Sequence, residues 1–198
     1  EGVQVILDVS PVIGIPQGLP ARDVIVSMNH REAQQIISAK HGLDQCQGQY
    51  RERCDQASEA SMVASLLGHP VVVRAGAEGA YFARAAASEV PAAGAAATPD
   101  TAPVGASAEG PVAAPVAASA NTGADVTYIP TPRVAVIDTN GAGDAHSGVL
   151  AAALAQAIPL ERALLLANCA GALSTTIVGP ASCPAREQIE AAADALTH

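Results

Sequence analysis

Short apolar runs alternate with amphipathic segments along most of the chain. Short apolar runs, most of them rich in β-branched residues, predict strands at residues 3–8, 23–27, 71–74, 80–83, 127–129 and 134–137. Apolar positions at helical spacing predict helices over about 31–40, 57–67, 144–157, 160–175 and 184–196. This order of elements favours an α/β fold, with a mainly parallel sheet and helices on both faces.

One long segment departs from this pattern. Residues from about 85 to 126 are mostly Ala, Pro, Gly, Ser and Thr, contain no Lys or Arg, and show no hydrophobic period. Such a composition buries too little apolar surface to offset the entropy lost on ordering. We therefore expect a flexible surface insertion in a single, partial domain that spans 1–198, with a partner-binding tether as the alternative.

The composition excludes several classes of protein. A formal charge of −9 and only three tyrosines and one phenylalanine disfavour a nucleic-acid surface. No run of about 18 apolar residues predicts a membrane helix. Lys40 is the only lysine and is followed by His41 and Gly42, so neither a Walker A loop nor a protein-kinase lysine is present. The chain has four cysteines, Cys46, Cys54, Cys169 and Cys183, and none of them forms a Cys-x-x-Cys pair. This pattern favours reduced thiols in a cytoplasmic protein.

The run Asp138-Thr-Asn-Gly-Ala-Gly-Asp144 lies between a predicted strand and a predicted helix. Ligands of open α/β sheets bind beyond the C-terminal ends of the strands. Gly141 and Gly143 let backbone N–H groups approach an anion, and the helix start adds a positive dipole end. Asp144 could then accept a proton from an attacking hydroxyl during phosphoryl transfer. These residues alone equally allow Asp144 to be a helix cap beside a tight turn.

Four motifs, in order, resemble those of the ribokinase-like, or PfkB, carbohydrate kinases. Residues 138–144 are similar to the C-terminal signature of that family, and Asn29-His-Arg-Glu32 is similar to its Asn-x-x-Glu motif. Residues 71–81 resemble its strand and glycine turn over the nucleotide, and residues 167–184 its adenine and cation segment. The resemblance covers nearly the whole chain apart from the insertion, and it implies a ribokinase-like, three-layer α/β/α fold.

The resemblance implies an ATP-dependent kinase that phosphorylates a sugar hydroxyl and uses Mg²⁺ and a potassium-like ion. Asp144 would be the general base, and Gly141, Ala142 and Gly143 would form the anion hole. Asn29 and Glu32 would organise Mg²⁺ and phosphate, largely through water. The ATP site would be lined by Asn29, Arg74, Ala75, Gly76, Ala77, Glu78, Gly79, Gly143 and Asn168. The potassium-like ion would be surrounded by Asp138, Asn140, Ser174, Ile177, Gly179 and Ser182.

Simpler interpretations stay open for several of these residues. Asn29 and Glu32 could be a helix cap and a solvated acid in the first turn, and Asn168 a polar residue that packs a helix on the sheet. His146 stands where the family usually has an aromatic residue, and we expect it to be a packed or capping histidine. Arg74 stands where the family has threonine at the nucleotide turn.

The first half of the family's proteins, with a glycine-rich sugar signature and a β lid, is absent from these 198 residues. The sequence also begins at Glu1, close to an apolar strand, so we expect the chain to be the C-terminal part of such a kinase. Two alternatives remain: a nucleoside kinase of the same fold, and a non-catalytic nucleotide-binding remnant. The expected partner is a small sugar or nucleoside, with neither nucleic acid nor membrane, and a homodimer would pair through the missing lid.

Overall fold

A computed structural model of the chain describes residues 4–10, 24–41, 55–85 and 125–197. In these ranges five strands form one sheet in the order β1-β2-β3-β4-β5. The sheet pairs β1 with β2 and β2 with β3 in parallel, whereas β4 runs antiparallel to both β3 and β5. Only β4 is reversed among them, which confirms the mainly parallel sheet. The strands are β1 (Val5–Asp8), β2 (Val24–Asn29), β3 (Val71–Arg74), β4 (Ala80–Arg84) and β5 (Asp125–Ile129).

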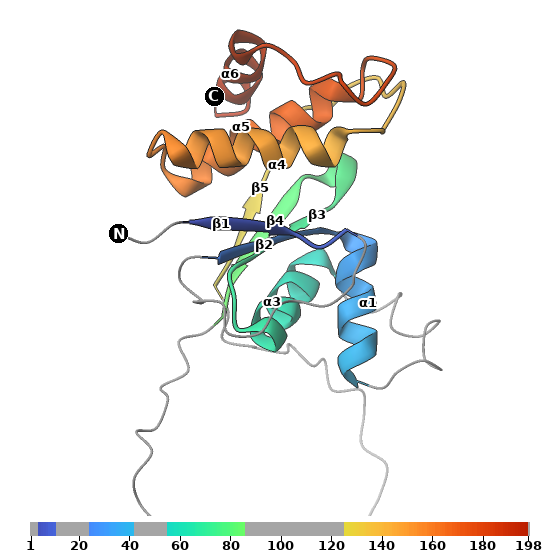
Figure 1. Cartoon of the computed structure of the whole chain (residues 1–198), viewed down its shortest axis with the longest axis vertical. Coiled ribbons are helices and arrows are strands. Elements are labelled where there is room, and N and C mark those ends of the chain that lie inside the picture. Colours follow the sequence, from blue (N-terminus) through green and yellow to red (C-terminus); the bar gives the residue numbers. More distant parts are fainter. Residues whose placement is uncertain (1–3, 11–23, 42–54, 86–124, 198) are drawn as a thin grey trace, which may run out of the picture.

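Helices cover both faces of the sheet (Figure 1). One face carries α1 (His30–His41) and α3 (Gln56–Leu67), and the other carries α4 (Ala142–Ala155), α5 (Leu160–Ser174) and α6 (Arg186–Ala195). A short 3₁₀ turn, η1 (Gly76–Glu78), joins β3 to β4. The three-layer α/β/α arrangement is therefore confirmed.

The central strand β3 shows why its sequence is apolar throughout. Val72 packs into the core under α4, α5 and α6, whereas Val71 and Val73 pack into the core against α1 and α3. All three side chains are fully buried. Successive side chains of a strand point to opposite faces, so a strand covered by helices on both sides needs apolar residues at every position.

The ends of α3 follow from its sequence. Asp55 caps the first turn by accepting a hydrogen bond from the Ser58 N–H at 2.7 Å, and this bond holds the pKa of Asp55 below its usual range. Gly68 ends the helix in the left-handed conformation at φ +67°, which glycine adopts without steric cost. The next residues, His69 and Pro70, then lead directly into β3.

The strand predicted at 134–137 is wrong. These residues are irregular, and Val136 and Ile137 are 59% and 64% exposed. The N–H groups of Ile137 and Asp138 both donate to the Thr175 carbonyl, at 2.8 and 3.0 Å, so the segment is tied to the end of α5 instead of the sheet. β5 occupies the edge beside β4. An apolar β-branched run forms a strand only where a neighbouring strand offers its backbone groups.

Most of the insertion predicted at about 85–126 lies outside the described residues, as do Cys46 and Cys54. Its last two residues correct the predicted boundary, because Asp125 and Val126 belong to β5 and pair with Arg84 and Ala83. The described cysteines are free thiols, Cys169 buried and Cys183 exposed. Within the described ranges no helix is long and apolar enough to cross a lipid bilayer.

Candidate active site

The glycine turn before α4 has a backbone that only glycine accommodates. Gly141 is the N-cap of α4 and has φ +78°, in the left-handed region that favours glycine. A Cβ at this position would lie 2.2 Å from the Pro180 carbonyl oxygen. The turn therefore rests directly on the loop that follows α5, and the missing side chain allows this contact.

Two backbone N–H groups in the first turn of α4 are free to bind an anion. The Ala142 N–H donates to the Thr139 carbonyl at 3.3 Å, but the N–H groups of Gly143 and Asp144 have no acceptor among the described residues. Unpaired N–H groups and the helix dipole together attract anions such as phosphate. Of the anion hole implied by the sequence, the N–H groups of Gly141 and Gly143 have no acceptor among the described residues, whereas the Ala142 N–H is paired within the turn.

The Asp144 carboxylate is exposed and makes no hydrogen bond or ion pair within the described part of the chain. The interpretation of Asp144 as the helix cap is wrong, because Gly141 occupies the capping position. A side chain that serves neither capping nor ion pairing is available to a ligand. Its position in the first turn of α4 places it beside the free N–H groups.

Arg74, the last residue of β3, is fixed by contacts to two segments, the end of β1 and the start of α4. Its Nη1 donates to Asp8 Oδ2 at 2.9 Å, and its Nη2 donates to Asp8 Oδ1 at 3.4 Å. Nη1 also lies 3.4 Å from the Gly143 carbonyl oxygen and from Ser147 Oγ, and Ser147 donates to Asp8 at 2.9 Å. Asp8 at the end of β1 thus holds the guanidinium of Arg74, at the end of β3, against the first turns of α4.

A cavity of about 680 Å³ opens at this turn, a size typical of small-molecule sites. Seven residues of the predicted nucleotide set line it: Asn29, Arg74, Gly76, Ala77, Gly79, Gly143 and Asn168. Ala75 and Glu78 do not, and Glu78 accepts a hydrogen bond from the Gln56 amide at 2.7 Å. Asp144 does not line the cavity either. Sequence reasoning missed the wall formed by Thr131, Pro132, Arg133, Val134 and Val136, because it assigned no role to 131–133 and predicted a strand at 134–137.

Asn29 and Glu32 form a reciprocal cap on α1. The Asn29 side-chain oxygen accepts from the Glu32 N–H at 3.0 Å, and the Glu32 carboxylate accepts from the Asn29 N–H at 2.7 Å. The capping interpretation is thereby confirmed, but Glu32 is only 7% exposed and is not a solvated acid. Asn29 also lines the cavity, whereas Glu32 does not.

The structure brings together part of the predicted cation set. Asp138 accepts from the N–H groups of Asn140 at 3.0 Å and Gly179 at 2.9 Å, and these two bonds hold the pKa of Asp138 below its usual range. Ser182 is 5% exposed and its Oγ has no partner in the described ranges. By contrast, Ser174 donates to the Gly171 carbonyl of its own helix at 2.8 Å, and Ile177 is 53% exposed.

Asn168 on α5 packs the helix against the end of β5, which agrees with the alternative that it is a polar residue holding a helix on the sheet. Its Nδ2 donates to the carbonyl oxygens of Ile129 and Pro130, both at 3.0 Å. The same residue lines the cavity. In the described ranges, no three His, Cys, Asp or Glu side chains gather as they would around a metal ion.

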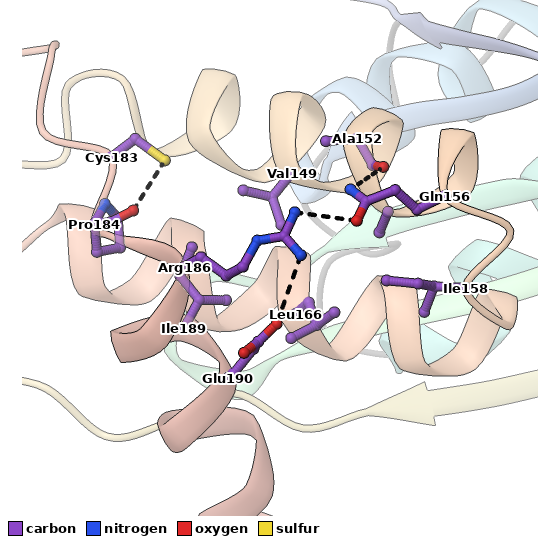
Figure 2. A pocket seen from close by; sticks show the side chains of 11 residues that line it. Val149, Ala152, Gln156, Ile158, Leu166, Cys183, Pro184, Arg186, Ile189 and Glu190 are labelled. Atoms are coloured by element: carbon purple, nitrogen blue, oxygen red, sulfur yellow. Dashed lines mark hydrogen bonds and ion pairs between the residues drawn. The ribbon is translucent and has the colours of Figure 1, made fainter.

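A second, smaller cavity of about 200 Å³ lies among α4, α5 and α6 (Figure 2). Its wall is largely apolar and includes Val149, Leu166 and Ile189. Arg186 spans one side, at 3.1 Å from the Gln156 side-chain oxygen and 3.9 Å from Glu190. Arg186 is also the first residue of α6, but its guanidinium is already engaged by the Gln156 and Glu190 side chains.

Comparison with known proteins agrees with this arrangement. Residues 114–187 match the pfkB family carbohydrate kinases. Over 58 residues the chain is 50% identical to the bifunctional protein HldE of Pectobacterium carotovorum subsp. carotovorum, a match that covers 27% of this chain and 12% of that protein.

Two crystal structures share the fold. Ribokinase from Thermotoga maritima aligns with a TM-score of 0.61 at 23% identity, over 95% of this chain and 48% of that one. Phosphofructokinase-2 from Escherichia coli, in complex with potassium, aligns with a TM-score of 0.52 at 18% identity, over 88% of this chain and 41% of that one. The fold is therefore ribokinase-like, and the resemblance to the PfkB kinases is confirmed. The chain spans about half the length of the ribokinase that it matches.

Proposed function

We propose that the protein is an ATP-dependent kinase that transfers the γ-phosphoryl group of ATP to a hydroxyl of a sugar. The observation that carries this proposal is the free N–H pair of Gly143 and Asp144 at the start of α4, beside a cavity of about 680 Å³. The match to the pfkB family carbohydrate kinases supports a carbohydrate as the acceptor.

Phosphate would be bound without a lysine. The Gly143 and Asp144 N–H groups and the α4 dipole would meet the phosphate oxygens, since helix starts bind such anions well. Arg74 lines the same cavity, and its guanidinium is held by Asp8 and Ser147. A charged group held in this way needs little rearrangement as negative charge develops during the transfer.

Asp144 would act as the general base. Its carboxylate would accept the proton of the acceptor hydroxyl as that oxygen forms a bond to the γ-phosphorus. The bond from the γ-phosphorus to the bridging oxygen breaks at the same time, and ADP leaves with that electron pair. Asp144 is exposed and lies outside the cavity wall. The nucleotide would then occupy the cavity, and the acceptor would approach from the side of Asp144.

Magnesium and potassium suit the residues present in different ways. Magnesium would be held chiefly by the phosphates and water, with Asn29 and Glu32 near the site, because it favours substrate phosphates over all-protein cages. When bound, it neutralises phosphate charge. Potassium suits oxygen donors, and the buried, unpaired Ser182 Oγ near the loop of Asp138 and Gly179 supports such a site. The potassium complex of phosphofructokinase-2 agrees with this assignment.

The direct test is an assay of phosphoryl transfer by the natural full-length protein. ADP release would be followed with Mg·ATP in potassium buffer, with a panel of sugars and nucleosides as acceptors. We expect release that depends on one or a few sugars. Release that depends on nucleosides alone would replace the carbohydrate acceptor with a nucleoside. ATP binding without transfer to any acceptor would contradict catalysis and identify a nucleotide-binding remnant.

The cellular setting follows from the same proposal. Cys169 and Cys183 are free thiols, as is usual in a reducing compartment, and ATP and sugars are available there. We propose a cytoplasmic enzyme whose partner is a small sugar. A homodimer would pair through the lid that the resemblance to the PfkB kinases implies.

A further inference from the structure

His146 on α4 is a buried histidine whose ring nitrogens lack well-aligned partners. The residue is 3% exposed, and neither Nδ1 nor Nε2 makes a hydrogen bond of good geometry in the described part of the chain. The Asn168 side chain lies close enough to interact with one of them, which leaves the other nitrogen without a partner. Buried polar atoms of native proteins are nearly always paired, and an unpaired one is unfavourable. The unpaired nitrogen indicates a place where a bound molecule supplies the missing partner.

The ring belongs to the wall of the larger cavity. His146 follows Gly143 by about one helical turn, and Cα–Cβ bonds in a helix tilt toward its N-terminus. The side chain therefore leans toward the turn that carries the free N–H groups. Helix α5 closes the other side, since a Cβ on Gly171 would lie 3.5 Å from His146 Cβ.

The ring is neutral, which limits what it can bind. Burial, and then the charge of Arg74, lower the pKa of His146 to about 3, while the hydrogen-bonding Asn168 side chain and the charge of Asp8 act in the opposite direction. A neutral imidazole has one donor nitrogen and one acceptor nitrogen. It therefore suits an uncharged group that can donate or accept, such as a hydroxyl or the edge of a nucleobase, better than a phosphate oxygen.

We propose that His146 is a specificity-determining residue that hydrogen-bonds an uncharged group of the nucleotide in this cavity, either a ribose hydroxyl or the edge of the base. The inference rests on the proposed function and names a contact within the same site. A nucleotide without the matching group would leave a buried ring nitrogen unpaired. Sites of this kind discriminate strongly against such analogues.

The test compares His146→Phe with the natural full-length protein. Phenylalanine fills similar space without ring nitrogens, so the KM for ATP should rise about tenfold while kcat stays within about twofold. His146→Gln keeps a donor and an acceptor and should restore part of the affinity. Deoxy-ATP analogues and GTP distinguish the two candidate partners of His146, a ribose hydroxyl and the edge of the base. Loss of discrimination against 2′- or 3′-deoxy-ATP identifies a ribose hydroxyl, and loss of discrimination against GTP identifies the base.

His69 is the matched control. It is also buried, at 7% exposed, with an unpaired Nδ1, but it does not line the cavity. His69→Phe should leave the KM for ATP and the nucleotide preference unchanged. An unchanged KM and preference in His146→Phe would overturn the inference while the proposed function stands.

A second measurement, on the natural protein, tests the inference even if His146→Phe does not fold. The ring ¹⁵N resonances of His146 in the natural protein should shift when a non-hydrolysable ATP analogue is added, because the unpaired nitrogen gains a partner. Resonances that stay in place while the analogue binds overturn the inference alone. A protein that binds no nucleotide would overturn both this inference and the proposed function.

Discussion

Asp144→Asn should lower kcat by about 10²–10⁴-fold, because general-base catalysis typically contributes that much. Asparagine has nearly the same shape but cannot accept the proton of the acceptor hydroxyl. The Asp144 carboxylate makes no hydrogen bond within the described ranges and does not cap α4, so the substitution removes little else. The affinity for ATP should stay within about threefold, since the N–H groups that bind phosphate are backbone groups. Steady-state kinetics and equilibrium ATP binding measure the two quantities.

Glu161 provides the matched control for this prediction. It is an exposed acid in the first turn of α5, so Glu161→Gln removes the same kind of favourable interaction with a helix dipole, worth about 0.3–1 kcal/mol of stability. That variant should keep full activity. If Asp144→Asn retains more than about a tenth of the natural kcat, the loss is below the usual range for a general base. Asp144 would then not be the base.

Gly141→Ala should also impair the enzyme strongly, but through the backbone. The new Cβ would lie 2.2 Å from the Pro180 carbonyl oxygen, at a residue with φ +78°, so the turn or the loop after α5 must move. We expect stability to fall by about 1–3 kcal/mol. The KM for ATP should rise as well, because the Gly143 and Asp144 N–H groups follow directly on this turn.

Gly148→Ala is the control substitution for this effect. Gly148 lies within α4, is exposed, and would place its Cβ in open space. Alanine in a helix is about 0.5–1 kcal/mol more favourable than glycine, so this variant should be slightly more stable with unchanged kinetics. Urea unfolding and ATP-dependent initial rates distinguish the two variants. Equal stability and KM for Gly141→Ala and the natural protein would show that the turn has no special role.

The sequence predicted the elements whose signals are local. Continuous apolar residues identified β3, and Gly68 with Pro70 identified the end of α3. A helix cap at Asn29 could be considered because this residue precedes a segment of helical spacing, but the pairing of the cap with Glu32 became visible only in the structure. The glycine turn at the start of α4 was located from Gly141 and Gly143 beside an apolar helix, and its role as an anion site stays a prediction.

Features that depend on distant segments could not be predicted. The apolar run 134–137 gives no sign that its neighbour is the end of α5 instead of a strand. Asp8 was noticeable as an acid at the end of a strand, but its contacts with Arg74 and Ser147 join residues far apart in the sequence. The environment of the His146 ring depends on α5 and the cavity wall, which pack around it from distant parts of the sequence.

The position of the nucleotide tests the central claim most directly. A crystal structure of the natural full-length protein with magnesium and a non-hydrolysable ATP analogue would show where the phosphates bind. We predict phosphate oxygens within hydrogen-bonding distance, roughly 2.7–3.2 Å, of the Gly143 and Asp144 nitrogens, with the rest of the nucleotide in the cavity beside Arg74. Phosphates bound elsewhere, with these two N–H groups left without a ligand, would contradict the account.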